Sequence, residues 1–415
     1  MKVLGIIVEY NPFHKGHLYH IKKAKEVTSS DYVVCIMSGN FVQRGEPAII
    51  NKWARTEVAL NYEIDLVIEL PFVFSMSSAE YFSLSAIKIL DSLGIVDFIC
   101  FGSESGNIKT LNKIADILVN ESNKFSKILK FHLSKGISYP SARQKTLSEF
   151  FNINLSKEIT SPNNILGIEY LKALKKLKST IKPFTISRLG NSYNDEKLSG
   201  ALSSASSIRK VLNDNTISID SKLIKIENSI PEKSLSIIKR EFENNLCPVN
   251  TKFYDNIIIS LIRRYSSAEL KNIPYISEGL ENKFKKNSNL FSSIDQVIKH
   301  TKSKRYTYSR LQRTIFNIMI GVNYNDFNLF QDIKSPIYAR ILGFNNNGIK
   351  LLLRIKNNSI IPTSTKFSKF YNSCNSTINK IAYYDRLSTD LYVLGYKNPD
   401  HKKSGQDFTN KFIRS

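Results

Sequence analysis

The sequence predicts an α/β fold, with a Rossmann-like parallel sheet followed by a mainly helical C-terminal domain. Over the N-terminal half, short apolar runs of strand length alternate with longer segments that have helical spacing. The apolar runs are almost uninterrupted, as expected for strands buried on both faces of a parallel sheet. After Arg209 this alternation stops.

The strands and helices of the sheet domain can be placed in order. Five apolar runs are predicted to form strands, at residues 2–8, 32–37, 65–70, 97–101 and 182–187. Helical spacing occupies residues 17–27, 52–61, 77–93, 107–118, 124–133 and 161–177. Ligands of such sheets bind at the carboxyl ends of the strands, near the point where the strand order switches. Functional residues are therefore expected directly after the first, second and fourth strands.

The C-terminal half has a different pattern. Residues 211–330 are polar and mostly helical in pattern, residues 336–356 carry a further helical pattern, and residues 381–396 form a Tyr-rich amphipathic segment. A chain of 415 residues is long for one core. We therefore predict two domains, residues 1–212 with the sheet and residues 213–415 with the helices.

The formal charge of +23 is concentrated in the C-terminal half. Residues 1–100 contain 9 Lys and Arg against 11 Asp and Glu, whereas residues 211–415 contain 32 against 17. A concentrated surplus predicts a polyanionic partner such as a nucleic acid. The alternative is a compositional bias, because the chain is also rich in Lys, Asn and Ile.

Cysteine spacing and hydropathy argue against other classes of protein. The four cysteines, at positions 35, 100, 247 and 374, form no CxxC pair, so neither a zinc motif nor a redox motif is present. Scattered cysteines are typical of a reducing cytoplasm. No apolar run approaches about 18–20 residues, so no membrane span is predicted. Nothing in the sequence indicates an obligate protein partner.

The motif His14-Lys15-Gly16-His17 follows the first predicted strand, at the start of the first helix. A helix N-terminus presents unpaired N–H groups and a positive dipole, which suit a phosphate. Gly16 lets phosphates approach the backbone, and the two imidazoles can stabilise charge as the α-phosphorus is attacked. We predict His14 and His17 as catalytic residues; the alternative is a pair of exposed loop histidines. No P-loop, GxGxxG, kinase or GxSxG motif is present.

Two further positions lie at the same edge of the predicted sheet. Arg188 ends the fifth strand, where its guanidinium fork would suit a phosphate; a surface charge is the alternative. Gly102 directly follows the fourth strand, where it would let adenine or ribose lie against the backbone. An ordinary turn glycine is the alternative reading for Gly102.

A basic segment occupies residues 299–313, which contain six Lys and Arg and no acidic residue. Basic groups can neutralise backbone phosphates, while Tyr306 and Tyr308 between them can stack on unpaired bases. We predict RNA contacts for Lys302, Lys304, Arg305, Tyr306, Arg310 and Arg313. A solvated helix face is the alternative, although such a face more often mixes both signs of charge.

The HxGH motif is the signature of the nucleotidylyltransferase superfamily, and residues 203–209 (SSASSIR) resemble its second signature, except at Ala205. Longer blocks resemble the bacterial tRNA(Met) cytidine acetate ligase family: GIIVEYNPFHKGHLYH, MSGNFVQRGEPAIINKWARTEVAL, DLVIELPFVFS, FGSES, SPNNILGIEYLKAL and KRYTYSRLQRTIF. They lie in order between about residues 4 and 316. The resemblance implies an enzyme that activates acetate with ATP as acetyl-adenylate, releases pyrophosphate and acetylates N4 of the wobble cytidine of elongator tRNA(Met).

The resemblance also implies site residues. ATP contacts are expected at Ile7, Val8, Glu9, Tyr10, Asn11, Pro12, Phe13, His14, Lys15, Gly16, His17, Leu18, Tyr19, His20, Gly102, Asn163, Arg188, Ser206 and Arg209. From the sequence alone, Asn163 and the serines before Arg209 could equally be helix caps. Gly39 and Asn40, after the second strand, are tentative contacts for acetate or cytosine, and a plain loop is the alternative. Mg²⁺ is expected with ATP, although no ligand cluster is visible.

Two other classes of function stay open. A small-molecule adenylyltransferase would share the HxGH motif, but it would be a shorter chain without a large basic appendage. A nucleotide-dependent RNA-binding protein without catalysis would leave the nucleotide residues unexplained. Spacing alone does not single out a general base among candidates such as Glu9, Glu46 and Glu104.

Overall fold

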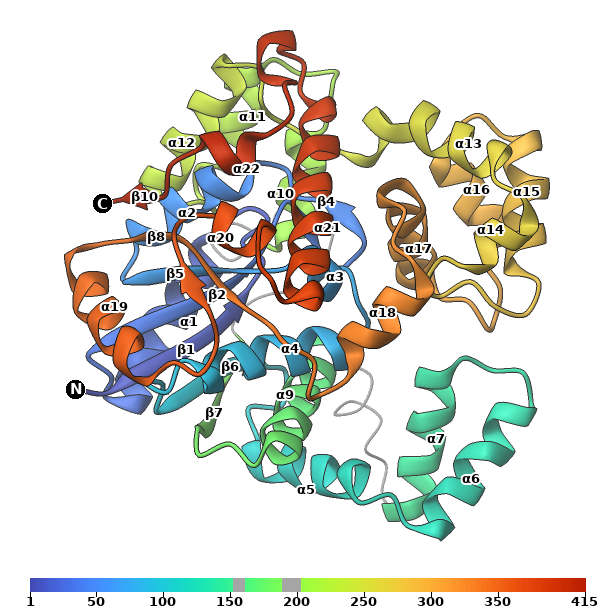
Figure 1. Ribbon diagram of the computed structural model, residues 1–415, viewed down its shortest axis with the longest axis horizontal. Helices are drawn as coiled ribbons and strands as arrows, with labels where there is room; N and C mark the ends of the chain where they lie inside the picture. The colour runs from blue at the N-terminus through green and yellow to red at the C-terminus, as the bar shows by residue number, and fades with distance from the viewer. Residues whose placement is uncertain (152–160, 189–202) are drawn as a thin grey trace.

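One mixed sheet forms the centre of the protein, as seen in the computed structural model, which describes residues 1–151, 161–188 and 203–415 (Figure 1). The strand order is β10-β8-β5-β2-β1-β6-β7, with β9 paired to β8. The strands are β1 (Val3–Val8), β2 (Tyr32–Ser38), β5 (Leu66–Leu70), β6 (Phe98–Ser103), β7 (Lys182–Ser187), β8 (Ala339–Phe344), β9 (Thr363–Ser364) and β10 (Ile413–Arg414). Strands β1, β2, β5, β6 and β7 run parallel. The predicted Rossmann-like sheet is confirmed.

Helices cover both faces of the parallel strands. Successive side chains of a strand point to opposite faces, so Ile36 lies in the apolar cluster with α4 and α9, whereas Cys35 lies in the cluster with α1 and α2. The helices of this region are α1 (Lys15–Thr28), α2 (Lys52–Leu60), α3 (Phe72–Ser75), α4 (Ala79–Ser92), α5 (Ile108–Val119), α6 (Asn123–Ser134), α7 (Tyr139–Phe151), α9 (Pro162–Leu177) and α10 (Ala205–Leu212). The five predicted strands and six predicted helices are confirmed within a few residues.

Most of the chain after α10 is helical. Its helices are α11 (Ile219–Ile226), α12 (Glu232–Glu243), α13 (Asp255–Arg264), α14 (Ser267–Lys271), α15 (Leu280–Leu290), α16 (Ile294–Thr301), α17 (Tyr308–Ile320), α18 (Tyr324–Gln331), α19 (Asn346–Asn358), α20 (Ser368–Tyr371), α21 (Ser376–Tyr392) and α22 (Gln406–Thr409). Short 3₁₀ turns occupy η1 (Thr251–Tyr254), η2 (Val393–Gly395) and η3 (Pro399–His401). Helices α13–α16 group to one side of the sheet, and α21 returns across it (Figure 1).

The prediction of one helical pattern over residues 336–356 is wrong in its first part. Residues 339–344 form β8, which pairs antiparallel with β5, and only residues 346–358 form a helix. All six residues of β8 are buried. Apart from Arg340 this run is apolar on both faces, and so short a run has no periodicity to distinguish a buried strand from a buried helix. The sheet therefore takes strands from both sides of the predicted domain boundary at residue 212. The division of the chain into two domains at this residue stays a prediction.

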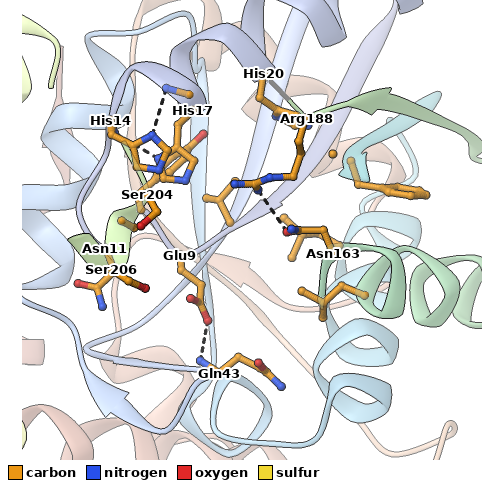
Figure 2. Close-up of a pocket in the computed structure, with 18 of the residues that line it drawn as sticks. Glu9, Asn11, His14, His17, His20, Gln43, Asn163, Arg188, Ser204 and Ser206 are labelled. Atoms are coloured by element: carbon orange, nitrogen blue, oxygen red, sulfur yellow. Dashed lines mark hydrogen bonds between the residues drawn. The ribbon is translucent and has the colours of Figure 1, made fainter. Parts of the chain in front are cut away.

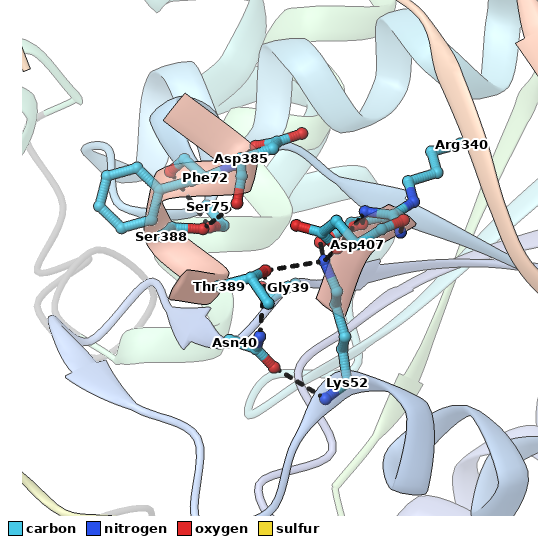
Figure 3. A network of polar contacts seen from close by, with 12 residues as sticks. Gly39, Asn40, Lys52, Phe72, Ser75, Arg340, Asp385, Ser388, Thr389 and Asp407 are labelled. Atoms are coloured by element: carbon cyan, nitrogen blue, oxygen red, sulfur yellow. Dashed lines mark hydrogen bonds and ion pairs between the residues drawn. The ribbon is translucent and has the colours of Figure 1, made fainter. Parts of the chain in front are cut away.

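Four buried charged side chains link α22, which contains Asp407, to the sheet and to α2 (Figure 3). Lys52 Nζ lies 2.8 Å from Glu69 Oε1 and 2.6 Å from Asp407 Oδ1. Arg340 lies 3.0 Å from Glu69 Oε2 and 2.6 Å from Asp407 Oδ1. Two cations thus meet two anions, and Arg340 and Lys52 hold the pKa of the Asp407 carboxyl below its ordinary value despite its burial. Balanced charges of this kind are stable only while all four are present.

The helices of the described ranges are too short or too polar to cross a bilayer. None of them combines the length and the apolar character that a membrane span needs.

Candidate active site

A cavity opens at the carboxyl ends of β1, β6 and β7, beside the N-terminus of α1. Strand β1 is where the strand order switches, because β2 lies on one side of it and β6 on the other. Of the predicted ATP contacts, the structure places fifteen in the wall of the cavity: Ile7, Val8, Glu9, Tyr10, Asn11, His14, Gly16, His17, Tyr19, His20, Gly102, Asn163, Arg188, Ser206 and Arg209. Four others do not line it: Pro12, Phe13, Lys15 and Leu18.

The two histidines of the HxGH motif form the cap of α1 (Figure 2). The Gly16 N–H donates to His14 Nδ1 over 3.1 Å, and the His14 N–H donates to His17 Nδ1 over 3.2 Å. Their rings are stacked, with centroids 3.7 Å apart. A Cβ on residue 16 would lie 2.9 Å from His14 Cε1, so glycine is required there for the ring to fold over the helix start.

These hydrogen bonds fix the tautomer of both rings. An Nδ1 that accepts a hydrogen bond carries no proton, so the proton of each neutral ring is on Nε2. Burial, together with Arg188 and Arg209, lowers the pKa of His14 to about 3, and burial and His14 lower that of His17 well below its ordinary value. Near neutral pH, both rings are therefore neutral donors whose Nε2–H groups are left for a ligand, and an anion bound there would raise both pKa values.

Arginines supply the positive charge of the cavity wall. Arg209, on α10, donates to the Asn11 carbonyl over 2.8 Å and lies 2.8 Å from Glu46. Arg44 donates to Ser206 Oγ over 3.2 Å. The serine turn before Arg209 is also a helix cap, as its alternative reading proposed, because Ser204 Oγ accepts from the Ser207 N–H. Both readings are compatible, since a helix N-terminus in a cavity wall can hold an anion.

The opposite wall carries a second polar cluster. Arg188 donates to Asn163 Oδ1 over 3.2 Å (Figure 2), and the Asn163 side chain donates to Glu104 over 2.7 Å. Gly102 lies beneath this pair, and a Cβ there would lie 3.2 Å from Arg188 Cγ. His20 Nε2 is buried without a hydrogen-bond partner in the described structure, so a ligand could supply its missing partner.

Sequence reasoning missed the hairpin that closes one side of the cavity. Gln43 and Arg44, between β3 (Phe41–Val42) and β4 (Glu46–Pro47), line it. Their signal was present, because they follow the second strand, at whose end chemistry was expected. The sequence analysis instead predicted substrate contacts for Gly39 and Asn40, which do not line the cavity.

The tentative assignment of Gly39 and Asn40 as substrate contacts is corrected by their burial in the scaffold. Asn40 is only 2% exposed, its side-chain N–H donates to Thr389 Oγ1, and its side-chain Oδ1 accepts from the Lys52 N–H (Figure 3). The Gly39 carbonyl accepts from Arg55. The plain structural reading is therefore the correct one for these two residues.

The basic segment divides into exposed and buried members. Lys302 and Lys304 are accessible, and Arg305 is half exposed beside Glu278. Arg310 is partly buried and donates to the Tyr275 carbonyl over 2.9 Å. These four side chains remain candidates for RNA contacts.

Two members of the segment are structural. Tyr306 is 3% exposed and its hydroxyl donates to the Ser277 carbonyl, so its ring has no free face for a base. Arg313 is 8% exposed and donates to the Gln43 carbonyl over 3.1 Å. The prediction of direct RNA contacts for these two residues is corrected, because side chains that fill the core cannot also stack or pair outside it. Their basic and aromatic character alone did not reveal this burial.

The side chains of the described ranges form no cluster that could hold a metal ion. Within residues 1–151, 161–188 and 203–415, no three His, Cys, Asp or Glu side chains are grouped so that they could hold one. An Mg²⁺ ion that arrives with ATP usually keeps several waters and is held partly by the phosphates.

The sheet, with an HxGH cap at the end of its first strand, defines a nucleotidyltransferase of the HIGH type, and the family model "HIGH Nucleotidyl Transferase" matches residues 1–407. A tRNA(Met) cytidine acetate ligase of Acetivibrio thermocellus is 48% identical over 416 residues, covering 100% of both chains. One from Clostridium novyi is 47% identical over 401 residues and 95% of each chain. The chain belongs to the tRNA(Met) cytidine acetate ligase family.

Solved structures agree with this assignment. The crystal structure of Thermotoga maritima TmcAL in its apo form has a TM-score of 0.94 at 33% identity and covers 100% of both chains. The same protein bound with alpha-thio ATP has a TM-score of 0.93 at 33% identity, covering 100% of this chain and 99% of the other. The fold is therefore shared along the whole length.

Proposed function

We propose that the protein is an ATP-dependent ligase that activates acetate as acetyl-adenylate and transfers the acetyl group to N4 of the wobble cytidine of elongator tRNA(Met). The observation that carries this proposal is the cap of α1, where two neutral imidazoles leave their Nε2–H groups for a ligand at the positive end of the helix. The family relatives support the substrates, because they are named tRNA(Met) cytidine acetate ligases.

In the first step, a carboxylate oxygen of acetate attacks the α-phosphorus of ATP and pyrophosphate leaves. Charge grows on the phosphoryl oxygens, and donors already aimed at it stabilise that charge without reorganisation. His14 and His17 supply such donors at the positive end of α1. Arg209 adds positive charge from the neighbouring α10. Mg²⁺ is expected to arrive bound to the triphosphate.

In the second step, the exocyclic amine of cytosine attacks the acetyl carbonyl and AMP leaves. That amine is a weak nucleophile, so positioning contributes most of the rate. The basic segment is well placed for this, because α17 packs on the hairpin that lines the cavity: Arg313 donates to the Gln43 carbonyl. A wobble base is unpaired in its loop and can be splayed into a cavity.

The partners and location follow from this chemistry. A tRNA anticodon arm and acetate would be the substrates, the cytoplasm would be the compartment, and no obligate protein partner is required. The four cysteines are unpaired in the structure, three of them buried, which suits a reducing compartment.

The test of this function is incubation of the protein with ATP, labelled acetate and tRNA. We expect label on the tRNA and AMP and pyrophosphate as products. Pyrophosphate exchange that depends on a phosphorylated cofactor precursor instead of acetate would favour a small-molecule adenylyltransferase. Tight tRNA binding without ATP turnover would favour a non-catalytic RNA-binding protein.

Two variants separate the halves of the proposed reaction. His17→Ala should abolish adenylate formation and leave tRNA affinity within about twofold. The double variant Lys302→Ala/Lys304→Ala should weaken tRNA binding and lower the slope of log K against log[salt] by about 2, while acetate-dependent pyrophosphate exchange is unchanged. Loss of the same step in both variants would contradict this division of roles.

A further inference from the structure

A partly buried carboxylate lies in the cavity wall at the end of β1. The Glu9 side chain lines the cavity, and its Oε1 accepts a hydrogen bond from the Gln43 N–H over 2.7 Å (Figure 2). Its other oxygen, Oε2, has no hydrogen-bond partner among the residues that the structure describes. Because only Oε1 accepts a hydrogen bond from the protein, Oε2 can accept one from a donor on a ligand.

The surroundings of Glu9 show which part of the ligand it meets. Its carboxylate points toward Gln43, away from both the HxGH cap and the pair of Arg188 and Asn163 (Figure 2). The cap presents donors that suit phosphate, and a carboxylate among the phosphates would repel them. Gln43 belongs to the hairpin on which Arg313 of α17 packs. Glu9 therefore faces the side of the cavity nearest to the basic segment.

The three carboxylates that the sequence offered as bases differ in their partners. Glu104 is occupied, because one oxygen accepts from the Asn163 side chain and the other from the Asn164 N–H. Glu46 lies 2.8 Å from the Arg209 guanidinium. Glu9 alone of the three lines the cavity, and its Oε2 accepts no hydrogen bond from the described residues.

We propose that the Glu9 carboxylate binds the exocyclic amine of the acceptor cytosine and takes the proton that this amine loses; the inference rests on the proposed function. The N4 lone pair forms a bond to the acetyl carbonyl carbon. The bond from that carbon to the phosphate oxygen of the adenylate breaks, and AMP leaves with the electron pair. The N4 proton passes to Glu9 Oε2 and from there to solvent.

The charges around Glu9 fit a base that works near neutral pH. Burial raises the pKa of Glu9 above its ordinary value, and Glu46 on the hairpin acts in the same direction. Arg44 and Arg209 act in the opposite direction. Arg55, on α2, lies behind the strand end and donates to the Glu9 backbone carbonyl. A carboxyl with a raised pKa is a better proton acceptor than a free one, provided that it is still ionised.

The test measures the two half-reactions separately in Glu9→Gln. This variant keeps the side-chain length and an oxygen for the Gln43 N–H, but it cannot take a proton. We expect acetate-dependent pyrophosphate exchange, which does not involve the cytosine, to fall by far less than the transfer step. Single-turnover acetylation of tRNA should fall by about 100-fold or more, the usual range for loss of a general base. The fall in transfer rate of the wild type at acidic pH should be absent from the variant.

Two further variants complete the test. Glu26→Gln, on the exposed side of α1, is the matched control and should leave both half-reactions unchanged. Glu9→Asp keeps a carboxylate but moves it back toward the main chain by one methylene group. We expect a slower acetyl transfer that still falls at acidic pH. This variant also tests the inference if circular dichroism shows that Glu9→Gln does not fold.

Two results overturn the inference alone: transfer by Glu9→Gln at the rate of Glu26→Gln, or equal loss of both half-reactions. A wild-type protein that makes no acetylated tRNA overturns the proposed function and this inference together.

Discussion

Each ring of the HxGH cap has two nitrogens with separate tasks, and two substitutions of His17 can separate them. Asparagine places its side-chain oxygen near the position of Nδ1, so His17→Asn can still accept the His14 N–H, now 3.2 Å from Nδ1. It has no group near the position of Nε2. Glutamine reaches the position of Nε2 with an N–H donor but leaves Nδ1 without a substitute.

The magnitudes follow from these contacts. Removal of one donor to a developing oxyanion costs roughly 10²–10³ in rate, so His17→Asn should lower acetate-dependent pyrophosphate exchange by that factor. Its free energy of unfolding should change by less than about 1 kcal/mol. His17→Gln leaves the buried N–H of His14 unpaired, which costs about 1–3 kcal/mol of stability, but it should keep exchange within about tenfold of wild type.

Pyrophosphate-exchange kinetics and urea unfolding of both variants provide the measurement. His14→Asn should behave like His17→Asn, because His14 Nδ1 accepts from the Gly16 N–H and His14 Nε2–H is the second donor offered to the phosphate. The reasoning would be refuted if His17→Asn exchanged pyrophosphate at the wild-type rate while His17→Gln was inactive. That result would place the reacting phosphate at Nδ1.

Three further predictions concern stability. Asp407→Asn should lower the free energy of unfolding by about 3–5 kcal/mol, because it leaves two buried cations with one anion. The control Asp400→Asn, at an exposed position, should change this free energy by less than about 0.5 kcal/mol. Urea unfolding of both variants provides the measurement. In the folded protein the pKa of His14 is lowered to about 3. Between pH 6.5 and 3 this histidine is therefore protonated only in the unfolded chain, so the free energy of unfolding falls as the pH falls. When the pH is lowered from 7.5 to 5, His14→Gln should lose about 2 kcal/mol less of this free energy than the wild type. Tyr306→Phe should cost about 1 kcal/mol through the lost bond to Ser277 and leave the Kd for tRNA within twofold, in contrast to the loss that a stacked tyrosine would produce.

The nucleotide side of the cavity was predictable because each of its residues lies at or near the end of a recognisable apolar run. The HxGH motif, Gly102 and Arg188 all follow strands whose apolar runs are plain, and the ends of parallel strands meet at one edge. The cap geometry was accessible in outline from the same motif. Its tautomers were not, because they depend on hydrogen bonds between the two histidines.

The remainder depended on contacts between distant segments, which periodicity cannot report. Arg313 and Gln43 are 270 positions apart, and their hydrogen bond decides that this arginine is structural. Asn40 is fixed by Thr389, 349 positions away. Residues 339–344 form a strand because β5 offers them a free edge. In each of these cases the local sequence was compatible with two environments, and the partner determined the outcome.

The position of Asp407 in the chain has a consequence for biosynthesis. Lys52, Glu69 and Arg340 all precede Asp407 in the chain, so the carboxylate that completes their charge balance is translated after them. Until residue 407 has been translated, the nascent polypeptide has two cations and only one anion for this buried group. A stop codon before residue 406 would remove both Asp407 and β10. The resulting product would carry an uncompensated positive charge in its interior, which costs about 3–5 kcal/mol.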